Sequence, residues 1–330
     1  MRRQKFMLAI LSIAIYAIST GATGQINQKT AAAWPTRPLR IVVGFPGGSS
    51  PDLTARALAE PLSKALGQPV IVENRVGAAG NIAADFVAKA TDNHTLGLMI
   101  NGNMTIAKLL NPRLPYDPLQ DLKPVSLIGT SPLVLVAPAH AAGATARDVL
   151  ANARNAGNTW NYGTPGVGTV GHLGMELLKS RAGVAPVHVP YSGYPQVATA
   201  MVSGDLQLAL LPPALAMAQI RAGKLRAIGM TASVRSTLVP DIPSLSEAGV
   251  RDFNLEIWNA VAAPNSMPPA VVARLSALVS EIVRTPEMRQ KLFQQGWNAV
   301  GTSAQGLANR IQADTVVLGG IIASQRITAE

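Results

Sequence analysis

The chain has 330 residues, a formal net charge of +10 and no cysteine. This length favours two domains, each with its own buried core. The lack of cysteine excludes a disulfide framework, a thiolate metal site and a lipid-attachment cysteine. Basic residues are spread along the chain without Lys/Arg clusters, so we expect no nucleic-acid binding, and attraction for small anions explains the charge better.

Residues 1–24 have the order of a secretory signal peptide: basic MRRQK, apolar FMLAILSIAIYAIS and small TGATG. The apolar run is shorter than the roughly 20 residues that span a bilayer, which argues against a membrane anchor. We expect cleavage after Gly24, with a site before Trp34 as the alternative, and a linker over residues 25–36. The sequence therefore predicts an exported protein that diffuses freely.

The first part of the expected mature chain alternates strands with helices. LRIVVGF is a continuous apolar run typical of a buried parallel strand, and the loop GFPGGSSPD follows it. Asp52 is expected to cap the next helix, and Gly67 to end it. The predicted elements are a strand over 39–45, a helix over 52–66, a strand over 70–74, a helix over 83–90 and a strand over 95–101.

The rest of the chain continues this alternation, which predicts two α/β units in series, each with a parallel sheet. Thr145-x-x-Asp148 resembles a capping box at the start of a helix. Further strands are predicted at 126–130, 133–138, 159–163, 187–191, 206–212, 225–231 and 254–264, and further helices at 145–155, 172–181, 214–222, 268–284, 286–295 and 303–324.

Gly166, Gly168 and Gly171 have the G-x-G-x-x-G spacing of dinucleotide-binding turns. That motif also needs an acid roughly 20 residues further on, at the end of the second strand. No Asp or Glu occurs between Glu176 and Asp205. The nicotinamide interpretation is therefore not favoured, and we expect no cofactor.

The same stretch has a more general meaning, because a glycine loop before a helix N-terminus favours an anion. GFPGGSSPD connects a strand to a helix in the same way. About 26 residues separate Gly44 from Val70, and about 25 separate Tyr162 from Val187, as expected for equivalent units. Two helix N-termini facing each other across a cleft would suit a small carboxylate, whereas the alternative is two tight turns without a ligand.

Catalytic alternatives have little support. His94, His140, His172 and His188 lack the spacing of zinc ligands, so no metal site is expected. Gly47-Gly48-Ser49-Ser50 does not match a G-x-S-x-G nucleophile turn. Asp52 could serve as a general base, but a position at a helix start favours capping. We expect a protein that is not an enzyme.

Many ordered stretches resemble the Bug family, the extracytoplasmic solute receptors of tripartite tricarboxylate transporters, from about Trp34 onward. They include WPTRPLRIVVGFPGGSSPDLTAR, LGQPVIVENRVGAAGNIAAD, LPYDPLQDLKPVSLIGTSPLVLV, NYGTPGVGTVGHLGMELLK, VHVPYSGYPQ and VPDIPSLSEAGV. The resemblance implies an α/β fold of the type II periplasmic-binding-protein class, with two α/β lobes, a ligand cleft and two crossovers. Lobe 1 would comprise 37–131 and 257–330, and lobe 2 would comprise 132–256.

The resemblance also implies that two loops hold the ligand's carboxylates from opposite sides. In the first loop (45–52) and the second (164–172), glycines would allow close approach of the backbone, while Ser and Thr hydroxyls would donate hydrogen bonds. A third group would contact the distal part of the ligand. The implied ligand-binding residues are Phe45, Gly47, Gly48, Ser49, Ser50, Asp52, Gly80, Asn101, Thr130, Ser131, Thr164, Gly166, Gly168, Thr169 and His172.

The implied function is a periplasmic solute-binding protein, expected to be monomeric, that delivers a small organic carboxylate to the membrane permease of a tripartite tricarboxylate transporter. A carboxylate-sensing receptor for a membrane signalling partner is the first alternative, and an exported enzyme is the second and less favoured one. Two departures from the family pattern affect the cleft. Gln207 replaces a frequent Asp, which favours a simple acid over an amino acid, and Trp258-Asn259-Ala260 replaces W-x-G.

Overall fold

The computed structural model describes residues 34–143 and 145–328. The chain divides into a first unit that ends at Thr36 and a second unit from Arg37 onward. The two sheets and their helices lie in the second unit. The predicted signal peptide and both predicted cleavage positions lie outside the described residues.

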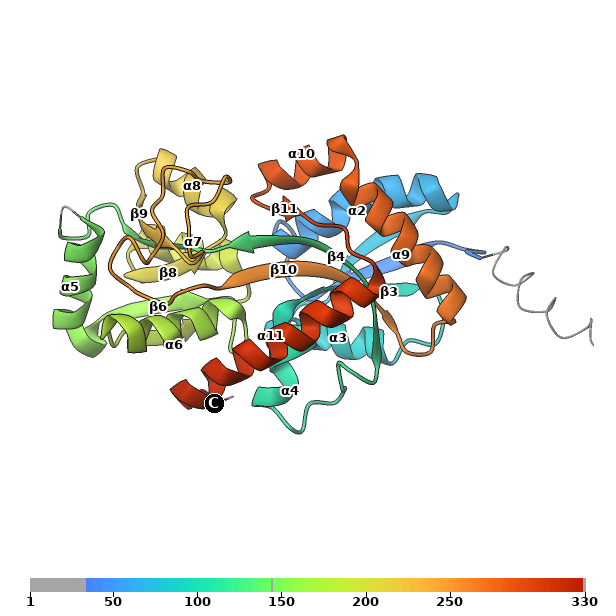
Figure 1. Ribbon diagram of the computed structural model, residues 1–330, viewed down its shortest axis with the longest axis horizontal. Helices are drawn as coiled ribbons and strands as arrows, with labels where there is room; N and C mark the ends of the chain where they lie inside the picture. Colours follow the sequence, from blue (N-terminus) through green and yellow to red (C-terminus); the bar gives the residue numbers. More distant parts are fainter. Residues whose placement is uncertain (1–33, 144, 329–330) are drawn as a thin grey trace, which may run out of the picture. The chain divides into compact units, whose positions relative to one another are not determined.

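In the part of the chain that the structure describes, strands form two sheets (Figure 1). The larger has the order β11-β4-β10-β3-β1-β2, and we call it, with the helices that pack on it, lobe 1. Its strands are β1 (Leu39–Val43), β2 (Val70–Asn74), β3 (Thr95–Ile100), β4 (Leu122–Pro132), β10 (Glu256–Pro264) and β11 (Asn298–Ala299).

The smaller sheet has the order β7-β6-β8-β5-β9 and forms, with its helices, lobe 2. Its strands are β5 (Val134–Pro138), β6 (Asn161–Thr164), β7 (Val187–Pro190), β8 (Leu208–Leu211) and β9 (Leu225–Met230). Apolar residues fill its centre, since every residue of β5 and β8 is buried.

Both sheets are mixed, which corrects the prediction of purely parallel sheets. β1 pairs in parallel with β2 and β3, but β10 runs antiparallel to β3 and β4. The reason is the connection between the lobes. The chain leaves lobe 1 through β4 and enters β5 after the single residue Leu133, and it returns through β10, so the leaving and returning strands run in opposite directions.

The two strand-loop-helix-strand units predicted from the glycine loops are present. In lobe 1 they are β1, α2 (Ser50–Leu66) and β2, and in lobe 2 they are β6, α6 (Val170–Ala182) and β7. β1 lies between β2 and β3, as β6 lies between β7 and β8. Each glycine loop therefore leaves the carboxyl end of a strand at a topological switch point, where α/β folds bind ligands.

Helix boundaries mostly agree with the sequence patterns. Thr145 and Asp148 form the predicted capping box, and Gly67 ends α2 in a left-handed conformation. The expected cap at Asp52 is wrong, because Ser49 is the N-cap and Asp52 lies in the first turn. The remaining helices are α3 (Asn81–Ala88), α4 (Ala107–Leu110), α5 (Ala146–Ala156), α7 (Tyr194–Ser203), α8 (Pro213–Arg221), α9 (Pro269–Arg284), α10 (Pro286–Gln294) and α11 (Ala304–Gln325).

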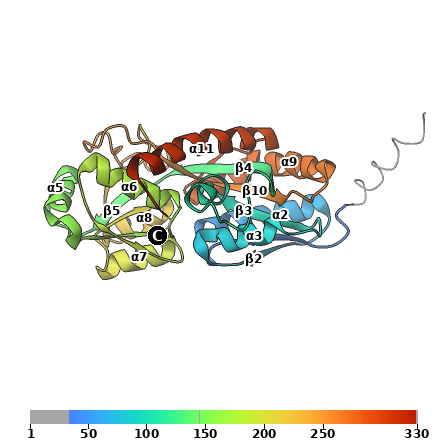
Figure 2. The ribbon, with the colours of Figure 1, turned by 90° about the horizontal axis from the view of Figure 1, so that it is seen from below.

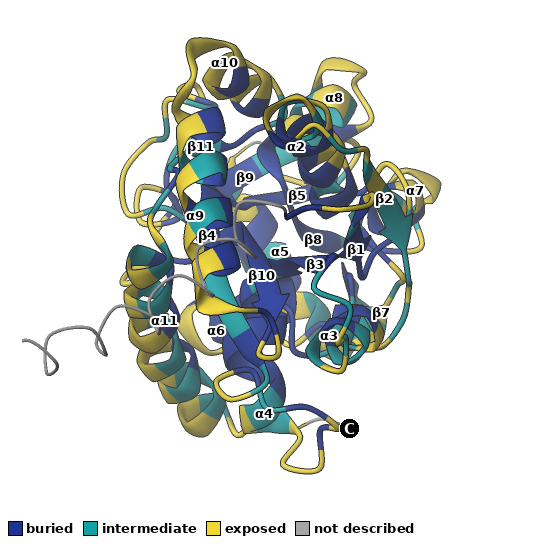
Figure 3. Cartoon of the chain, turned by 90° about the vertical axis from the view of Figure 1, so that its right-hand side faces the viewer, coloured by how far each residue is buried: buried dark blue, intermediate teal, exposed yellow. Residues whose placement is uncertain are grey.

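The helices cover the sheets and turn their exposed faces to the outside (Figure 3). α2 packs on β2 and α9, α9 packs on β4, and α6 and α7 pack on β8. The C-terminal helix α11 contacts both β4 of lobe 1 and α6 of lobe 2, and Figure 2 shows it along one side of the molecule. Trp258 of β10, fully buried, donates from its indole Nε1 to Asp314 of α11 at 2.6 Å.

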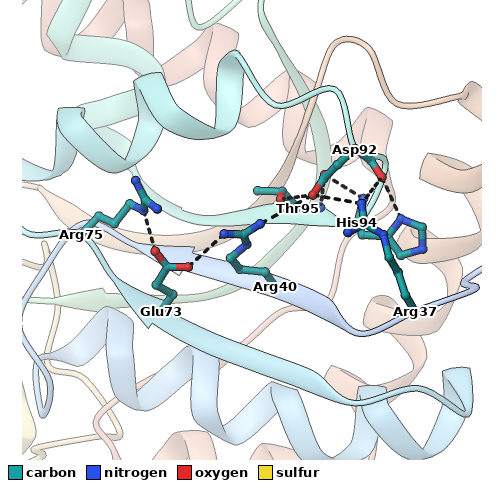
Figure 4. A network of polar contacts seen from close by, with 7 residues as sticks. All are labelled: Arg37, Arg40, Glu73, Arg75, Asp92, His94 and Thr95. Carbon is teal, nitrogen blue, oxygen red and sulfur yellow. Dashed lines mark hydrogen bonds and ion pairs between the residues drawn. The ribbon is translucent and has the colours of Figure 1, made fainter.

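A polar network joins β2, β1 and the turn before β3 in lobe 1 (Figure 4). Glu73 of β2 accepts from Arg40 of β1 at 3.2 Å and from Arg75 at 2.6 Å. Asp92, in the turn before β3, accepts from the backbone N–H groups of His94 and Thr95, both at 3.0 Å. Burial raises the pKa of Asp92, but these hydrogen bonds outweigh it and hold the pKa below its ordinary value.

The network predicts a cost for removing the charge of Asp92. In Asp92→Asn, the Oδ2 position can no longer accept from the Thr95 hydroxyl or interact with the nearby arginines. We expect the free energy of unfolding at pH 7 to fall by about 1–2 kcal/mol, measured by urea denaturation. The matched control is Asp252→Asn, whose carboxylate is exposed and 3.9 Å from Arg181. Equal effects of the two variants would contradict this assignment.

Candidate ligand-binding cavity

A small cavity lies where the two lobes meet, at the starts of α2, α6 and α7. We call it the inner cavity. Its volume is about 40 Å³. Its lining comes from both lobes and comprises Phe45, Ser49, Ser50, Pro51, Ile100, Asn101, Pro165, Thr169, Val170, Tyr194, Ile257, Trp258, Asn259 and Trp297.

A larger outer cavity of about 610 Å³ opens beside it. Its walls include the loop Gly77–Asn81 of lobe 1 and Pro165–Gly168 and Pro190–Ser192 of lobe 2. Pro165 lines both cavities. Phe45 of the inner cavity packs against Gly80 of the outer one, where an added Cβ would lie 2.9 Å from the Phe45 ring. The two spaces are thus adjacent, and their combined lining spans the lobes.

The lobes are in close contact around these cavities. A Cβ at Gly102 of lobe 1 would lie 2.8 Å from the carbonyl oxygen of Gly168 in lobe 2. A Cβ at Gly166 would lie 3.0 Å from the Cβ of Ala79. The inner cavity has room for only one or a few waters, since a water needs roughly 10–15 Å³ of such space. This arrangement is therefore a closed one.

The loop at the start of α2 is held by Asp52, which is almost fully buried. Its carboxylate accepts from the backbone N–H of Gly48 and from the Asn74 amide, both at 2.9 Å, and pairs with Arg56 at 3.0 Å. Burial raises the pKa of Asp52, but the hydrogen bonds from Arg56, Gly48 and Asn74 hold it below its ordinary value. Asp52 is thus an ionised residue that shapes the loop from behind the cavity.

The predicted donor hydroxyls differ in their partners. Thr169 is the N-cap of α6, accepts from His172 N and donates to the carbonyl of Gly166 at 2.8 Å. The hydroxyl of Thr164 lies 2.7 Å from His188 Nε2. These two threonines hold the lobe 2 loop in shape. By contrast, the Ser49 hydroxyl is buried without a hydrogen-bond partner among the described residues.

A pair of histidines contacts the two threonines of the lobe 2 loop. The rings of His172 and His188 stack with their centroids 4.5 Å apart. The Tyr162 ring also stacks on His188, with centroids 4.9 Å apart. The Tyr162 hydroxyl donates to Glu176, which also pairs with Lys179 at 3.0 Å. Burial and the neighbouring His172 ring lower the pKa of His188 to about 4, and burial lowers that of His172. Both rings are neutral at pH 7.

The structure brings together only part of the predicted site. Phe45, Ser49, Ser50, Asn101 and Thr169 line the inner cavity, and Gly80, Gly166 and Gly168 line the outer one. The predicted residues that line neither cavity are Gly47, Gly48, Asp52, Thr130, Ser131, Thr164 and His172.

Several of these residues have structural partners instead. The Ser131 hydroxyl in β4 donates to the carbonyl of Gly296 at 2.7 Å. Thr130 is paired with Trp258 in the sheet. Asn101 lines the cavity, but its amide also donates to the carbonyl of Glu256 at 2.9 Å and so joins β3 to β10. Their assignment as ligand contacts remains a prediction.

Tyr194 and Trp297 are cavity residues that sequence reasoning did not find. Tyr194 is the first residue of α7, and that helix was not predicted. Gly193 followed two residues later by Pro195 is a helix-start signal that would have located it. Trp297 reaches the cavity from the segment before β11, and nothing in its local sequence indicates this.

The inner cavity is lined without any Asp, Glu, Lys, Arg or His. No cluster of three or more potential metal ligands occurs in residues 34–143 and 145–328. Within the same described residues, every helix is too short or too polar to cross a bilayer. The positive charge that this lining can offer is therefore that of helix N-termini and backbone N–H groups.

Two mixed α/β lobes joined by antiparallel crossover strands, with a cavity at facing helix starts, define a protein with the periplasmic-binding-protein fold. The family model for the tripartite tricarboxylate transporter family receptor matches residues 54–327, and the chain belongs to that family. It is 32% identical to the protein BugT of Bordetella pertussis over 286 residues, which cover 86% of this chain and 88% of BugT.

Solved structures of related proteins have a similar fold. An R. palustris protein with adipate has a TM-score of 0.86 and 29% identity, covering 89% of this chain and 99% of that one. MatC from Rhodopseudomonas palustris with bound malate has a TM-score of 0.82 and 30% identity, covering 88% and 100%. The family is one of solute-binding receptors of periplasmic transporters.

The histidine pair predicts a loss of stability in acid. Unfolded, His188 would titrate near pH 6.5, whereas the folded protein keeps it neutral down to about pH 4. Between these values the unfolded chain binds more protons, so stability falls as the pH falls. Lowering the pH from 7 to 4.5 should cost on the order of 2–3 kcal/mol through this residue.

Urea denaturation of His188→Gln at both pH values tests this, because glutamine cannot gain the charge. We expect a smaller difference between pH 7 and pH 4.5 than in the unmodified protein. His140→Gln, at an exposed position, should keep the original difference. The same pH dependence in the His188 variant would show that other groups cause the acid sensitivity.

Proposed function

We propose that this protein is a periplasmic receptor that captures a small organic carboxylate by closure of its two lobes and presents it to the permease of a tripartite tricarboxylate transporter. The main support is one observation: the starts of α2 and α6, from opposite lobes, line the same small cavity. Helix N-termini offer free N–H groups and a positive dipole end, which favour a carboxylate.

The size of the two cavities suggests how the acid lies. A carboxylate group suits the inner cavity of about 40 Å³, and the body of the acid extends into the outer cavity of about 610 Å³. This placement puts Gly80, which lines the outer cavity, near the distal part of the ligand. Adipate and malate, bound to the related R. palustris proteins, are acids of this kind.

The inner lining favours a simple acid over an amino acid, and the acid that lines the outer cavity is Asp85. The inner cavity has no carboxylate side chain that could pair with an ammonium group. Gln207, at the position where the resemblance expected an acid, donates to the carbonyl of Gly204 at 3.0 Å and accepts from Asn161 N at 2.8 Å, so it serves the start of β6. An ammonium group placed in the inner cavity would be buried without a partner charge, which is costly.

The remaining assignments follow from this proposal. We take residues 37–131 and 257–330 as lobe 1 and 132–256 as lobe 2, and we propose a monomer exported after cleavage of residues 1–24. No covalent chemistry is needed for capture and release. A membrane sensor is the alternative partner, since the same cavity would serve it.

A thermal-shift screen tests the ligand class. Adipate, malate, citrate, benzoate and glutamate are compared with adipamide as a neutral control. An acid at 100 times its dissociation constant should add about 2.7 kcal/mol to the free energy of unfolding. We expect simple acids to raise the unfolding temperature and adipamide to leave it unchanged. Stabilisation by adipamide alone would refute the carboxylate proposal.

Gly102→Ala tests whether binding of the acid requires the closed arrangement of the lobes. The added methyl would lie 2.8 Å from the carbonyl oxygen of Gly168 only when the lobes are closed. Overpacking of this kind costs about 1–3 kcal/mol, so affinity for the bound acid should fall roughly tenfold or more while the ligand-free protein keeps its stability. Isothermal titration calorimetry gives the affinity.

Gly320→Ala in α11 is the matched control, because a Cβ there meets no atom within 4 Å. It should bind the acid as the unmodified protein does. Unchanged affinity in Gly102→Ala would show that the ligand binds without the closed arrangement.

A further inference from the structure

Two residues that line the inner cavity, one from each lobe, have buried hydroxyls without a hydrogen-bond partner among the described residues. Ser49 Oγ, in lobe 1, belongs to a residue that is 3% exposed, and Tyr194 Oη belongs to the first residue of α7 in lobe 2. Neither atom has a hydrogen-bond partner among the described residues, and both residues line the inner cavity. A buried hydroxyl without a partner is costly, which points to a ligand that completes it.

The position of the Tyr194 hydroxyl is defined by its neighbours. Gly171, in the first turn of α6, leaves space for it, since a Cβ there would lie 2.6 Å from the Tyr194 oxygen. Gly193, just before Tyr194, lies against lobe 1, because its Cβ would be 3.3 Å from Pro46 Cδ. The phenol oxygen is therefore held against the first turn of α6, and the residue before Tyr194 lies against the lobe 1 loop that carries Ser49.

The chemistry of these groups matches a carboxylate. Burial raises the pKa of Tyr194, so the phenol stays protonated and can donate a hydrogen bond. Ser49 can donate as well, and carboxylate oxygens only accept. The rest of the inner lining is mainly apolar, with Phe45, Trp258 and Trp297 among its walls. In such surroundings, hydrogen bonds to a charged acceptor are strong.

We propose that Tyr194 Oη and Ser49 Oγ donate hydrogen bonds to the same carboxylate group of the bound acid, and that Tyr194 is a specificity-determining residue of the cleft. This inference rests on the proposed function. Because the donors come from different lobes, both hydrogen bonds form only when the lobes are closed. The pair thus ties recognition of the carboxylate to closure, and it favours a carboxylate over an amide because hydrogen bonds to a charged acceptor are stronger.

Tyr194→Phe, Ser49→Ala and the double variant test the pair, with adipate and malate as probes in isothermal titration calorimetry. Each single variant should weaken binding of the acid that binds the unmodified protein by about tenfold. The double variant should weaken it by less than the product of the two single effects, because the two hydroxyls share one ligand group. Ser246→Ala, at an exposed position, should leave the affinity unchanged.

Thermal unfolding of the ligand-free variants separates binding from folding. Neither hydroxyl has a partner among residues 34–143 and 145–328, so removing it should not lower the unfolding temperature. A lower unfolding temperature in Tyr194→Phe would reveal a structural role and overturn the inference. Unchanged affinity in that variant would overturn the pairing and leave the proposed function intact. If the unmodified protein bound no acid at all, the proposed function and the pairing would fail together.

Discussion

The starts of α2 and α6 meet across the inner cavity, and the rest of the site depends on this meeting. Both helix ends carry partial positive charge, so bringing them together without an anion is unfavourable. The fold places them there because β1 and β6 occupy equivalent positions in their sheets and send their glycine loops toward each other. Asp52 lies behind one loop and is neutralised by Arg56, so the cavity itself stays free of side-chain charge.

Two features explain how two lobes can enclose so small a cavity: the loop before α6 is held rigidly, and the backbones of the two lobes approach closely. On the lobe 2 side, Thr164, Thr169 and the His172–His188 stack fix the loop before α6. Across the cleft, Gly102 and Gly168 allow backbones to touch where any side chain would separate them. The residues that hold the loops are thus distinct from those that face the cavity.

Local patterns predicted much of this fold. The apolar strands, the capping box at Thr145 and the two equivalent glycine loops were found because each depends on neighbours in sequence. The antiparallel pairing of β4 with β10 was not, because it joins segments more than 120 residues apart. The same reason explains Trp297 and Tyr194 in the cavity, and the structural partners of Ser131 and Asn101, which residue type alone does not reveal.

The position of α11 determines the direction in which the lobes separate. This helix contacts β4 of lobe 1 and α6 of lobe 2, and it lies on the same side of the molecule as the paired strands β4 and β10 (Figure 2). Three connections therefore restrain one side, while the side of α3 and α7 has none of them. We therefore expect opening to be a rotation about an axis near α11 that widens the outer cavity on the α3 and α7 side. A partner that held α11 would restrain this rotation without touching the ligand.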